Sequence, residues 1–308
     1  MQTSTEQWFY PRGTLRRDRW ESVVDSSIDG WHHTGLRVVE LAEGGEVVVD
    51  AEAVERMVVP LSGGCTVDYE APGDTGVIIL TGRSSVFDGP SDVAYLPTGT
   101  SMVLRGSGRI ALAQAPTSVV HPVQVISPEG IPVELRGAGR SSRQVHNFGT
   151  PGTPGTFVAD KLIVCEVITP AENWSSYPPH KHDESLPGHE SALEEIYYFE
   201  SEVVRGATAN VHADPFGMFA TYASSADPIA INSLVRTGDV ALVPYGYHGP
   251  AVAAPGYDLY YLNVMAGPGS DRAWLISDDP QHAWIRSTWD GQEIDPRLPF
   301  KSEEKAQS

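Results

Sequence analysis

The sequence is poor in basic residues and has no long apolar run. Lysine and arginine number 21 against 40 aspartates and glutamates, which gives a formal net charge of −19 over 308 residues. This negative charge repels phosphate backbones and anionic lipid headgroups, so we expect neither nucleic acid nor a membrane as a partner. No apolar run approaches the roughly 20 residues that a membrane-spanning helix needs. The sequence therefore predicts a soluble protein.

Secretion signals and paired cysteines are also missing. Residues 1–10 show no basic start followed by an apolar stretch and a small-residue cleavage site, which favours a cytoplasmic location. Cys65 and Cys165 are the only cysteines, and they do not form a CxxC motif. In a reducing compartment this pattern predicts two buried free thiols rather than a disulfide.

Long helical patterns are scarce, whereas glycine and proline are plentiful. The 30 glycines and 24 prolines separate short β-branched or aromatic runs, at intervals of about 8–12 residues that are typical of an all-β sandwich or barrel. The only helix that we expect is a short one at residues 51–56. We expect strands at residues 46–49, 76–80, 92–96, 109–112, 162–164, 196–199 and 239–243.

One sequence pattern occurs twice. Residues 92–101 (DVAYLPTGTS) and 239–248 (DVALVPYGYH) both read as a strand that ends in Pro-x-Gly, and residues 55–59 correspond to 194–198 further upstream. The repeat predicts two domains, which we place at residues 1–135 and 136–308. Closure of each sheet would hide the strand edges, so the predicted fold is all-β with two tandem jelly-roll β-barrels.

Only the second copy carries a set of metal-binding side chains. His180 and His182 alternate on an extended segment, so both imidazoles should point to one face. Glu195 on the next strand and His248 at a strand end complete three imidazoles and one carboxylate. This set suits a divalent first-row metal with coordination positions left open for a substrate.

The neighbours of these residues define the alternatives. Glu194 is the competing carboxylate, although it should point to the opposite face of the strand from Glu195. Lys181 alternates with the two histidines and should face away from the metal. In the first copy, Arg56 and Ser101 stand where the second copy has Glu195 and His248, so we expect no metal there.

These motifs together resemble a known family. His-x-His, a downstream Glu and Pro-x-Gly-x-His resemble the cupin superfamily, and the repeat resembles a bicupin. Twelve residues separate His182 from Glu195, which is longer than in most cupins. This length agrees with the 5-deoxy-glucuronate isomerase family of bacterial inositol catabolism, which the chain closely resembles at residues 177–183 (YPPHKHD), 193–198 (LEEIYY), 246–248 (GYH) and 255–267 (PGYDLYYLNVMAG).

The resemblance implies a bicupin isomerase that converts a small sugar acid, 5-deoxy-D-glucuronate, to 2-deoxy-5-keto-D-gluconate with a divalent transition metal (Zn, Mn, Fe or Ni). Such a reaction moves a proton between adjacent carbons, and a metal with two open positions can stabilise the enediolate charge. The alternatives are the related uronate ketol-isomerase of pectin breakdown, a metal-dependent cupin dioxygenase and a non-catalytic ligand-binding protein.

Several roles stay open at this stage. Tyr247 and Tyr261 carry phenols suited to proton transfer, with core packing as the alternative. The oligomeric state is also open, and a homo-oligomer is among the allowed assemblies. A substrate carboxylate needs a cation, because a buried carboxylate without a partner is costly, and the candidates are Arg143, Lys161, Arg205 and Arg236.

Overall fold

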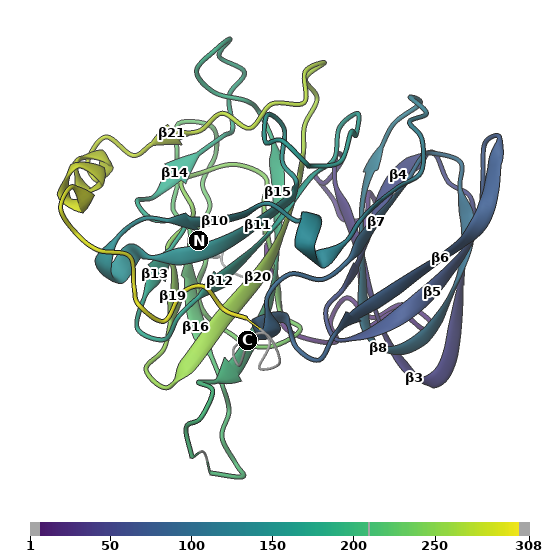
Figure 1. Ribbon diagram of the computed structural model, residues 1–308. Helices are drawn as coiled ribbons and strands as arrows, with labels where there is room; N and C mark the ends of the chain where they lie inside the picture. The colour runs from purple at the N-terminus through teal and green to yellow at the C-terminus, as the bar shows by residue number, and fades with distance from the viewer. Residues whose placement is uncertain (1–6, 209, 302–308) are drawn as a thin grey trace.

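The computed structural model describes residues 7–208 and 210–301, and its regular secondary structure consists almost entirely of strands (Figure 1). The first six residues of the segment searched for a secretion signal lie outside the described residues. The all-β prediction is confirmed, since the described helices are short 3₁₀ segments at Val86–Asp88, Pro128–Gly130, Gly139–Ser141 and Ala283–Trp289. Among the described residues, none of these helices is long and apolar enough to cross a membrane.

The helix expected at residues 51–56 is wrong. Strand β4 (Val54–Pro60) begins there instead and pairs with β8 (Ser101–Pro116) and β7 (Val93–Leu96). Valine-rich residues fit a buried strand better than a helix. The first half contains one antiparallel sheet in the order β2-β3-β8-β4-β7-β9, and a further pair of strands joins it through β8. Its other strands are β2 (Ser22–Val24), β3 (Gly35–Val49), β5 (Gly63–Ala71), β6 (Asp74–Arg83) and β9 (Gln124–Ile126).

The second half is built around a seven-stranded antiparallel sheet in the order β1-β18-β15-β20-β12-β11-β10. A four-stranded sheet, β13-β19-β16-β17, and the short pair β14-β21 complete it. The strands of the large sheet are β1 (Phe9–Tyr10), β10 (Val133–Arg136), β11 (Arg143–Gly149), β12 (Ile163–Thr169), β15 (Glu194–Val203), β18 (Val240–Val243) and β20 (Tyr257–Ala266). The others are β13 (Trp174–Ser175), β14 (His180–Lys181), β16 (Gly217–Ala220), β17 (Asn232–Val235), β19 (Ala251–Ala253) and β21 (Ser277–Asp278).

The two halves repeat the same strand register. Arg56 of β4 lies opposite Leu96 of β7, and Glu195 of β15 lies opposite Val243 of β18. These pairs match the two sequence repeats residue for residue. The domain boundary that we predicted between residues 135 and 136 falls within β10, which pairs with β11 of the second half. The division into two domains stays a prediction.

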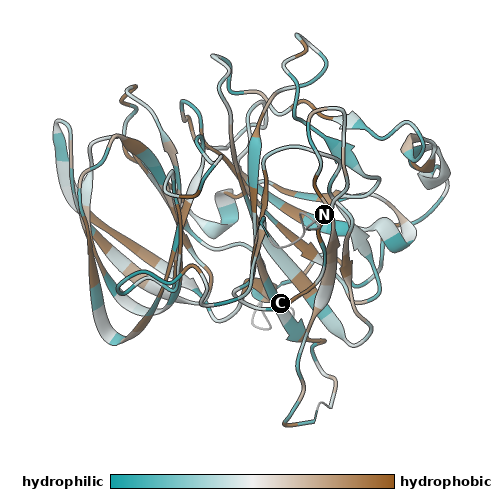
Figure 2. Ribbon diagram, turned by 180° about the vertical axis from the view of Figure 1, so that it is seen from behind, coloured by the Kyte–Doolittle hydropathy of each residue, from teal (hydrophilic) through white to brown (hydrophobic). Residues whose placement is uncertain are grey.

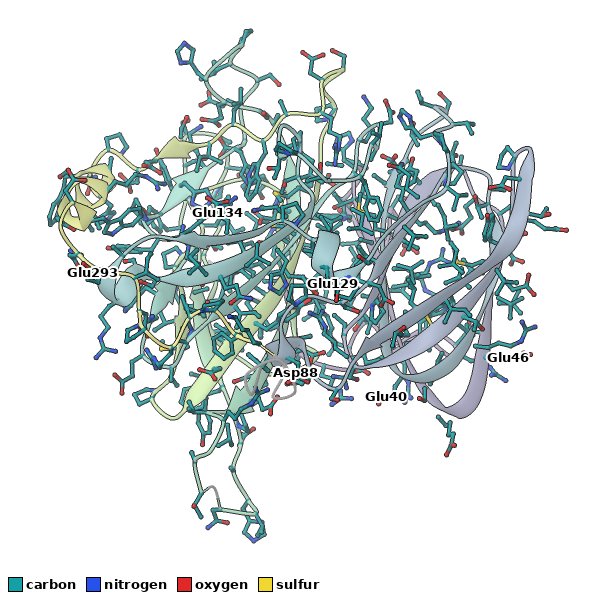
Figure 3. The ribbon with its side chains drawn as sticks, in the orientation of Figure 1. Glu40, Glu46, Asp88, Glu129, Glu134 and Glu293 are labelled. Atoms are coloured by element: carbon teal, nitrogen blue, oxygen red, sulfur yellow. The ribbon has the colours of Figure 1, made fainter. Side chains whose placement is uncertain are left out.

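Most apolar residues of the strands are buried, and several glutamates lie at the surface. Figure 2 shows hydrophobic colour along the central strands of both halves, in keeping with two clusters of buried apolar residues. Figure 3 shows labelled glutamates such as Glu46 and Glu293 at the outer edges of the molecule. Cys65 and Cys165 are buried and unbonded, as predicted, and burial raises the pKa of each thiol to about 12.

Two equivalent glutamates join the halves by a reciprocal clamp. Glu55 of β4 accepts the backbone N–H groups of residues 160, 161 and 162 at 2.9, 2.6 and 2.7 Å, just before β12. Glu194 of β15 accepts those of residues 32, 33 and 34 at 2.8, 2.6 and 3.2 Å, just before β3. Each half therefore fixes the segment that leads into a long strand of the other.

Removal of one clamp should weaken the whole fold. A Glu55→Ala variant loses four hydrogen bonds to a buried carboxylate, three from backbone N–H groups and one from the Tyr95 hydroxyl at 2.7 Å. It leaves these buried donors unpaired, so we expect the free energy of unfolding to fall by about 3–5 kcal/mol. Urea denaturation measures this change. Glu46→Ala is the control, because Glu46 is exposed and makes only a surface ion pair with Arg105, which should contribute less than about 1 kcal/mol. Equal unfolding free energies for the two variants would contradict the clamp.

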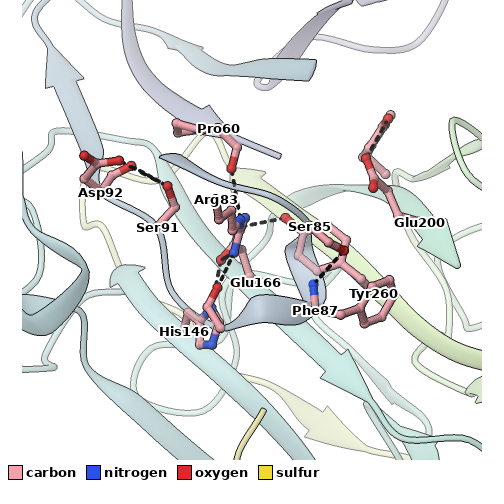
Figure 4. A network of polar contacts seen from close by, with 12 residues as sticks. Pro60, Arg83, Ser85, Phe87, Ser91, Asp92, His146, Glu166, Glu200 and Tyr260 are labelled. Carbon is pink, nitrogen blue, oxygen red and sulfur yellow. Dashed lines mark hydrogen bonds and ion pairs between the residues drawn. The ribbon is translucent and has the colours of Figure 1, made fainter. Parts of the chain in front are cut away.

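A buried ion pair crosses the same junction (Figure 4). Arg83 of β6 pairs with Glu166 of β12, which also contacts His146 Nδ1 at 2.8 Å and accepts the Tyr260 hydroxyl at 2.7 Å. Burial alone would raise the pKa of Glu166, but Arg83 and His146 outweigh it and lower this pKa to about 2. The carboxylate is therefore ionised in the folded protein over a wider pH range than in the unfolded chain.

This lowered pKa predicts acid sensitivity with a defined sign. The stabilisation by Glu166 is fully present above its ordinary pKa of 4.5 and is lost as the pH falls toward 2. A shift of this size corresponds to about 3 kcal/mol in the free energy of unfolding. Denaturation between pH 6 and pH 2 should show a steeper loss for the natural chain than for Glu166→Gln. Parallel curves for the two proteins would refute the assignment.

Candidate active site

Three histidines that are far apart in the sequence meet inside the second half. His180 and His248 exchange backbone hydrogen bonds of 3.0 and 2.9 Å, and Leu193 donates its N–H to the carbonyl of His182 at 2.9 Å. These contacts bring ligand atoms of the three imidazoles within 4.8 Å of one another. All three side chains are buried.

Glu195 joins this cluster and Glu194 does not. The Oε2 atom of Glu195 lies 2.9 Å from His182 Nε2 and 3.0 Å from His248 Nε2. Glu194 points the other way and is engaged in the clamp. Burial opposes ionisation of Glu195, but hydrogen bonds with the two histidines outweigh it and hold its pKa well below the usual range. The cluster therefore contains an ionised carboxylate.

Backbone carbonyls orient the imidazoles. The Nδ1 atoms of His180, His182 and His248 lie 3.3, 3.2 and 2.8 Å from the carbonyl oxygens of Pro178, Leu193 and Gly246. This arrangement leaves the Nε2 atoms of His182 and His248 directed at each other and at Glu195, as expected of a protein metal site. Two donors at about 2.1 Å from one ion and at right angles are about 3 Å apart, which agrees with the spacing of His182, His248 and Glu195.

The loops around the cluster are fixed by packing and by charge. Gly249 has a φ of +112°, and a Cβ atom there would lie 2.9 Å from His180 Cε1 and 2.2 Å from the carbonyl oxygen of Ser176. Glycine is therefore required beside His248. Lys181 binds Asp183 at 2.6 Å, and Asp183 accepts the Gly246 N–H at 2.8 Å. Both side chains thus support the loop that carries His248.

A cavity of about 230 Å³ opens beside His180 and Glu195. This is below the roughly 300–1,000 Å³ of pockets for drug-sized ligands, so it suits a small molecule. Three arginines line it, Arg136, Arg143 and Arg286. The site therefore combines a cluster of metal-binding residue types with a wall that carries three arginines, in a chain whose net charge is −19.

Arg143 is the wall arginine without an ion pair among the described residues, and its guanidinium lies over the Trp289 ring at 5.8 Å. Arg136 pairs with Glu134 at 2.8 Å, and Arg286 binds both oxygens of Asp278 at 2.5 and 2.7 Å. Arg143 has no ion pair within residues 7–208 and 210–301, donates to the Ser141 carbonyl at 3.1 Å and is 8% exposed. Burial lowers its pKa to about 10.

The other predicted cations lie elsewhere. Lys161 donates to the Gly269 carbonyl at 2.8 Å, Arg205 pairs with Asp88, and Arg236 pairs with Asp214 at 2.9 Å. None of the three lines the cavity described above. The structure therefore brings only Arg143 of the four sequence candidates to the histidine cluster.

Two donors in the cavity wall lack partners. Among the described residues, neither Asn263 Nδ2 nor Trp274 Nε1 has a hydrogen-bond acceptor, although both atoms are buried. Such donors normally have partners. Sequence reasoning missed both residues, together with Arg136 and Arg286. The only sequence signal for Asn263 as a site residue was its position inside segment 255–267, which resembles the isomerase family. Arg136 and Arg286 follow no local spacing rule that could have identified them.

The predicted tyrosines occupy different places. The hydroxyl of Tyr261 lies 2.7 Å from Ser176 Oγ, and Ser176 lines the cavity. Burial raises the pKa of Tyr261 to about 12, so its phenol is protonated at neutral pH. Tyr247 stacks on Tyr222 with 5.3 Å between ring centroids and does not line this cavity. A role of Tyr247 in proton transfer stays a prediction.

The first half fills the equivalent position with a protein cation. Arg56 is fully buried, pairs with Glu52 and donates to the Thr100 carbonyl at 3.0 Å. Ser101, which follows Thr100, starts β8. A guanidinium thus lies where the second half has Glu195.

Comparisons with known proteins agree with this geometry. The chain is 35% identical over 280 residues to a 5-deoxy-glucuronate isomerase of Geobacillus kaustophilus, over 90% of this chain and 91% of the relative. It is 38% identical to the enzyme of that name from Lacticaseibacillus casei, over 85% and 91% of the two chains. An IolB-like protein from Salmonella typhimurium has a similar structure, with a TM-score of 0.78, 31% identity and coverage of 90% and 98%.

A more distant likeness concerns the fold alone. The oxalate decarboxylase of Lactobacillus farciminis superposes with a TM-score of 0.60 at 10% identity, over 88% of each chain. The KduI/IolB family matches residues 9–285, which is most of the sequence. By this match and by its relatives, the chain belongs to the KduI/IolB family.

Proposed function

We propose that this protein is an aldose–ketose isomerase that converts 5-deoxy-D-glucuronate to 2-deoxy-5-keto-D-gluconate in inositol catabolism. The observation that carries the proposal is the cavity whose wall holds both Arg143, which has no ion pair among the described residues, and the cluster of His180 and Glu195. A sugar acid presents an anion at one end and an aldehyde beside a hydroxyl at the other. The names of the relatives support the same substrate.

We also propose that the two halves form a bicupin of two jelly-roll barrels and that only the second binds metal. The repeated strand register and the likeness to an oxalate decarboxylase support this architecture. His180, His182, Glu195 and His248 would hold one divalent ion, with Zn, Mn, Fe and Ni as the candidates. When bound, such an ion supplies a Lewis acid that polarises the two substrate oxygens.

The side chains of the protein then perform the remaining tasks. Arg143 binds the carboxylate, because a guanidinium matches its two oxygens. Asn263 donates its free N–H to a substrate hydroxyl. Ser176 connects the cavity to the Tyr261 phenol, which Ser175 contacts at 3.0 Å. This chain of hydroxyls would link a proton on the Tyr261 oxygen to the cavity through Ser176.

A single incubation tests the proposal. Metal-loaded protein should convert 5-deoxy-D-glucuronate to a product with a new ketone carbon signal in nuclear magnetic resonance spectra, without oxygen uptake. Oxygen consumption would favour the dioxygenase instead. Turnover of a 5-keto-4-deoxyuronate but not of 5-deoxy-D-glucuronate would favour the isomerase of pectin breakdown. Recovery of all these compounds unchanged would indicate a non-catalytic binding protein.

A further inference from the structure

The inner face of the large sheet changes its chemistry in a fixed order from strand to strand. Arg143 and Val145 lie two residues apart on β11, so both point to the same face. Val145 lies opposite Val167 of β12, and Asn263 of β20 lies opposite Tyr197 of β15. All of these residues line the cavity.

Across strands β11, β12, β20 and β15, the cavity wall therefore presents four groups in order. They are the guanidinium of Arg143, the apolar side chains of Val145 and Val167, the amide of Asn263 and the carboxylate of Glu195. Val145 and Val167 are 1% and 4% exposed. They offer no hydrogen-bonding atom, whereas Asn263 offers a donor that no described residue accepts. The two valines therefore lie next to Arg143, and Asn263 lies next to the proposed metal ligands.

We propose that Val145 and Val167 make this cavity selective for a sugar acid whose carbon next to the carboxylate is a methylene group. The inference rests on the proposed function and adds its basis for specificity. With the carboxylate on Arg143, the adjacent carbon contacts the two valines, and the hydroxyl-bearing carbons that follow reach Asn263. The aldehyde end then reaches His180 and Glu195.

This order fits one substrate and not its analogues. In 5-deoxy-D-glucuronate the carbon next to the carboxylate is a methylene, in D-glucuronate it carries a hydroxyl, and in the 5-keto-4-deoxyuronate it is a carbonyl. A hydroxyl or carbonyl against two valines loses its hydrogen bonds with water and gains none in return. An apolar pocket rejects an added hydroxyl by about 100-fold, so we expect kcat/KM for D-glucuronate to be lower by about that factor.

The experiment compares kcat/KM for 5-deoxy-D-glucuronate and D-glucuronate in the metal-loaded natural chain and in Val145→Thr and Val167→Thr. Threonine keeps the shape of valine and adds a hydroxyl that can meet the substrate hydroxyl. The preference for the deoxy sugar should fall at least about 10-fold in one or both variants. Because both substrates are measured on the same preparation, the ratio does not depend on the fraction of folded protein.

Val164→Thr is the matched control. Val164 is also buried on β12 but is an odd number of residues from Val167, so it faces away from the cavity. Its substitution should leave the preference unchanged. Equal kcat/KM values for the two sugars in the natural chain, or an unchanged preference in both cavity variants, would overturn the inference. If the natural chain fails to convert 5-deoxy-D-glucuronate at all, the proposed function fails instead.

Discussion

Replacement of His182 by alanine should remove nearly all bound metal and nearly all activity. His182 and His248 share Glu195 at 2.9 and 3.0 Å, so the loss of one imidazole opens the coordination sphere on one side. Elemental analysis should fall from about one ion per chain to almost none. Lewis-acid activation contributes several kcal/mol to such reactions, so kcat should fall by about 1,000-fold or more.

The same measurement separates the two adjacent glutamates. Glu195→Gln should lose metal, whereas Glu194→Gln should keep it and be less stable, because Glu194 holds backbone N–H groups of the first half. Ser101→Ala should change neither property, since Ser101 lies in the half that contains Arg56. Circular dichroism verifies that each variant is folded. Equal metal content in His182→Ala and the natural chain would disprove the ligand set.

Arg143→Ala should weaken binding of the sugar acid and leave the chain folded. The buried guanidinium lacks an ion pair among the residues that the structure describes, so its removal costs only the hydrogen bond to the Ser141 carbonyl and the contact with the Trp289 ring at 5.8 Å. A bidentate contact to a carboxylate contributes about 3–4 kcal/mol, and we expect kcat/KM to fall by about 100–1,000-fold. Most of this loss should appear as a higher KM, because the carboxylate does not react.

Two further variants define the role of this arginine. Arg143→Lys should retain part of the affinity for the sugar acid, since lysine keeps the positive charge but lacks the two parallel N–H donors of the guanidinium. Arg236→Ala should match the natural chain, because Arg236 pairs with Asp214 away from the cavity. An unchanged KM in Arg143→Ala would assign the carboxylate to another cation. Thermal denaturation of the same proteins verifies that each variant is folded.

The site residues that could be predicted from the sequence were those whose positions follow from strand alternation or from the sequence repeat. His180 and His182 alternate on one extended segment, and the repeat aligned Glu195 with Arg56, so their positions followed from strand geometry. The choice of Glu195 over Glu194 depended on the same alternation. The all-β class followed from the spacing of turn residues.

The cavity wall could not be predicted, because its members come from strands that are adjacent only after folding. Arg136 and Arg143 meet because β10 pairs with β11, and Arg286 reaches them from the segment after β21. The four cations proposed for the carboxylate were equivalent in sequence. Its place in the cavity wall and its burial distinguish Arg143 from the other three.

The reciprocal clamp makes the fold of the second half depend on the first half. A chain truncated to the second half would start β12 with three backbone donors that Glu55 no longer meets. We therefore expect that deletion of the first half does not leave a stably folded fragment. The histidine cluster thus relies on a part of the chain that contributes none of its four side chains.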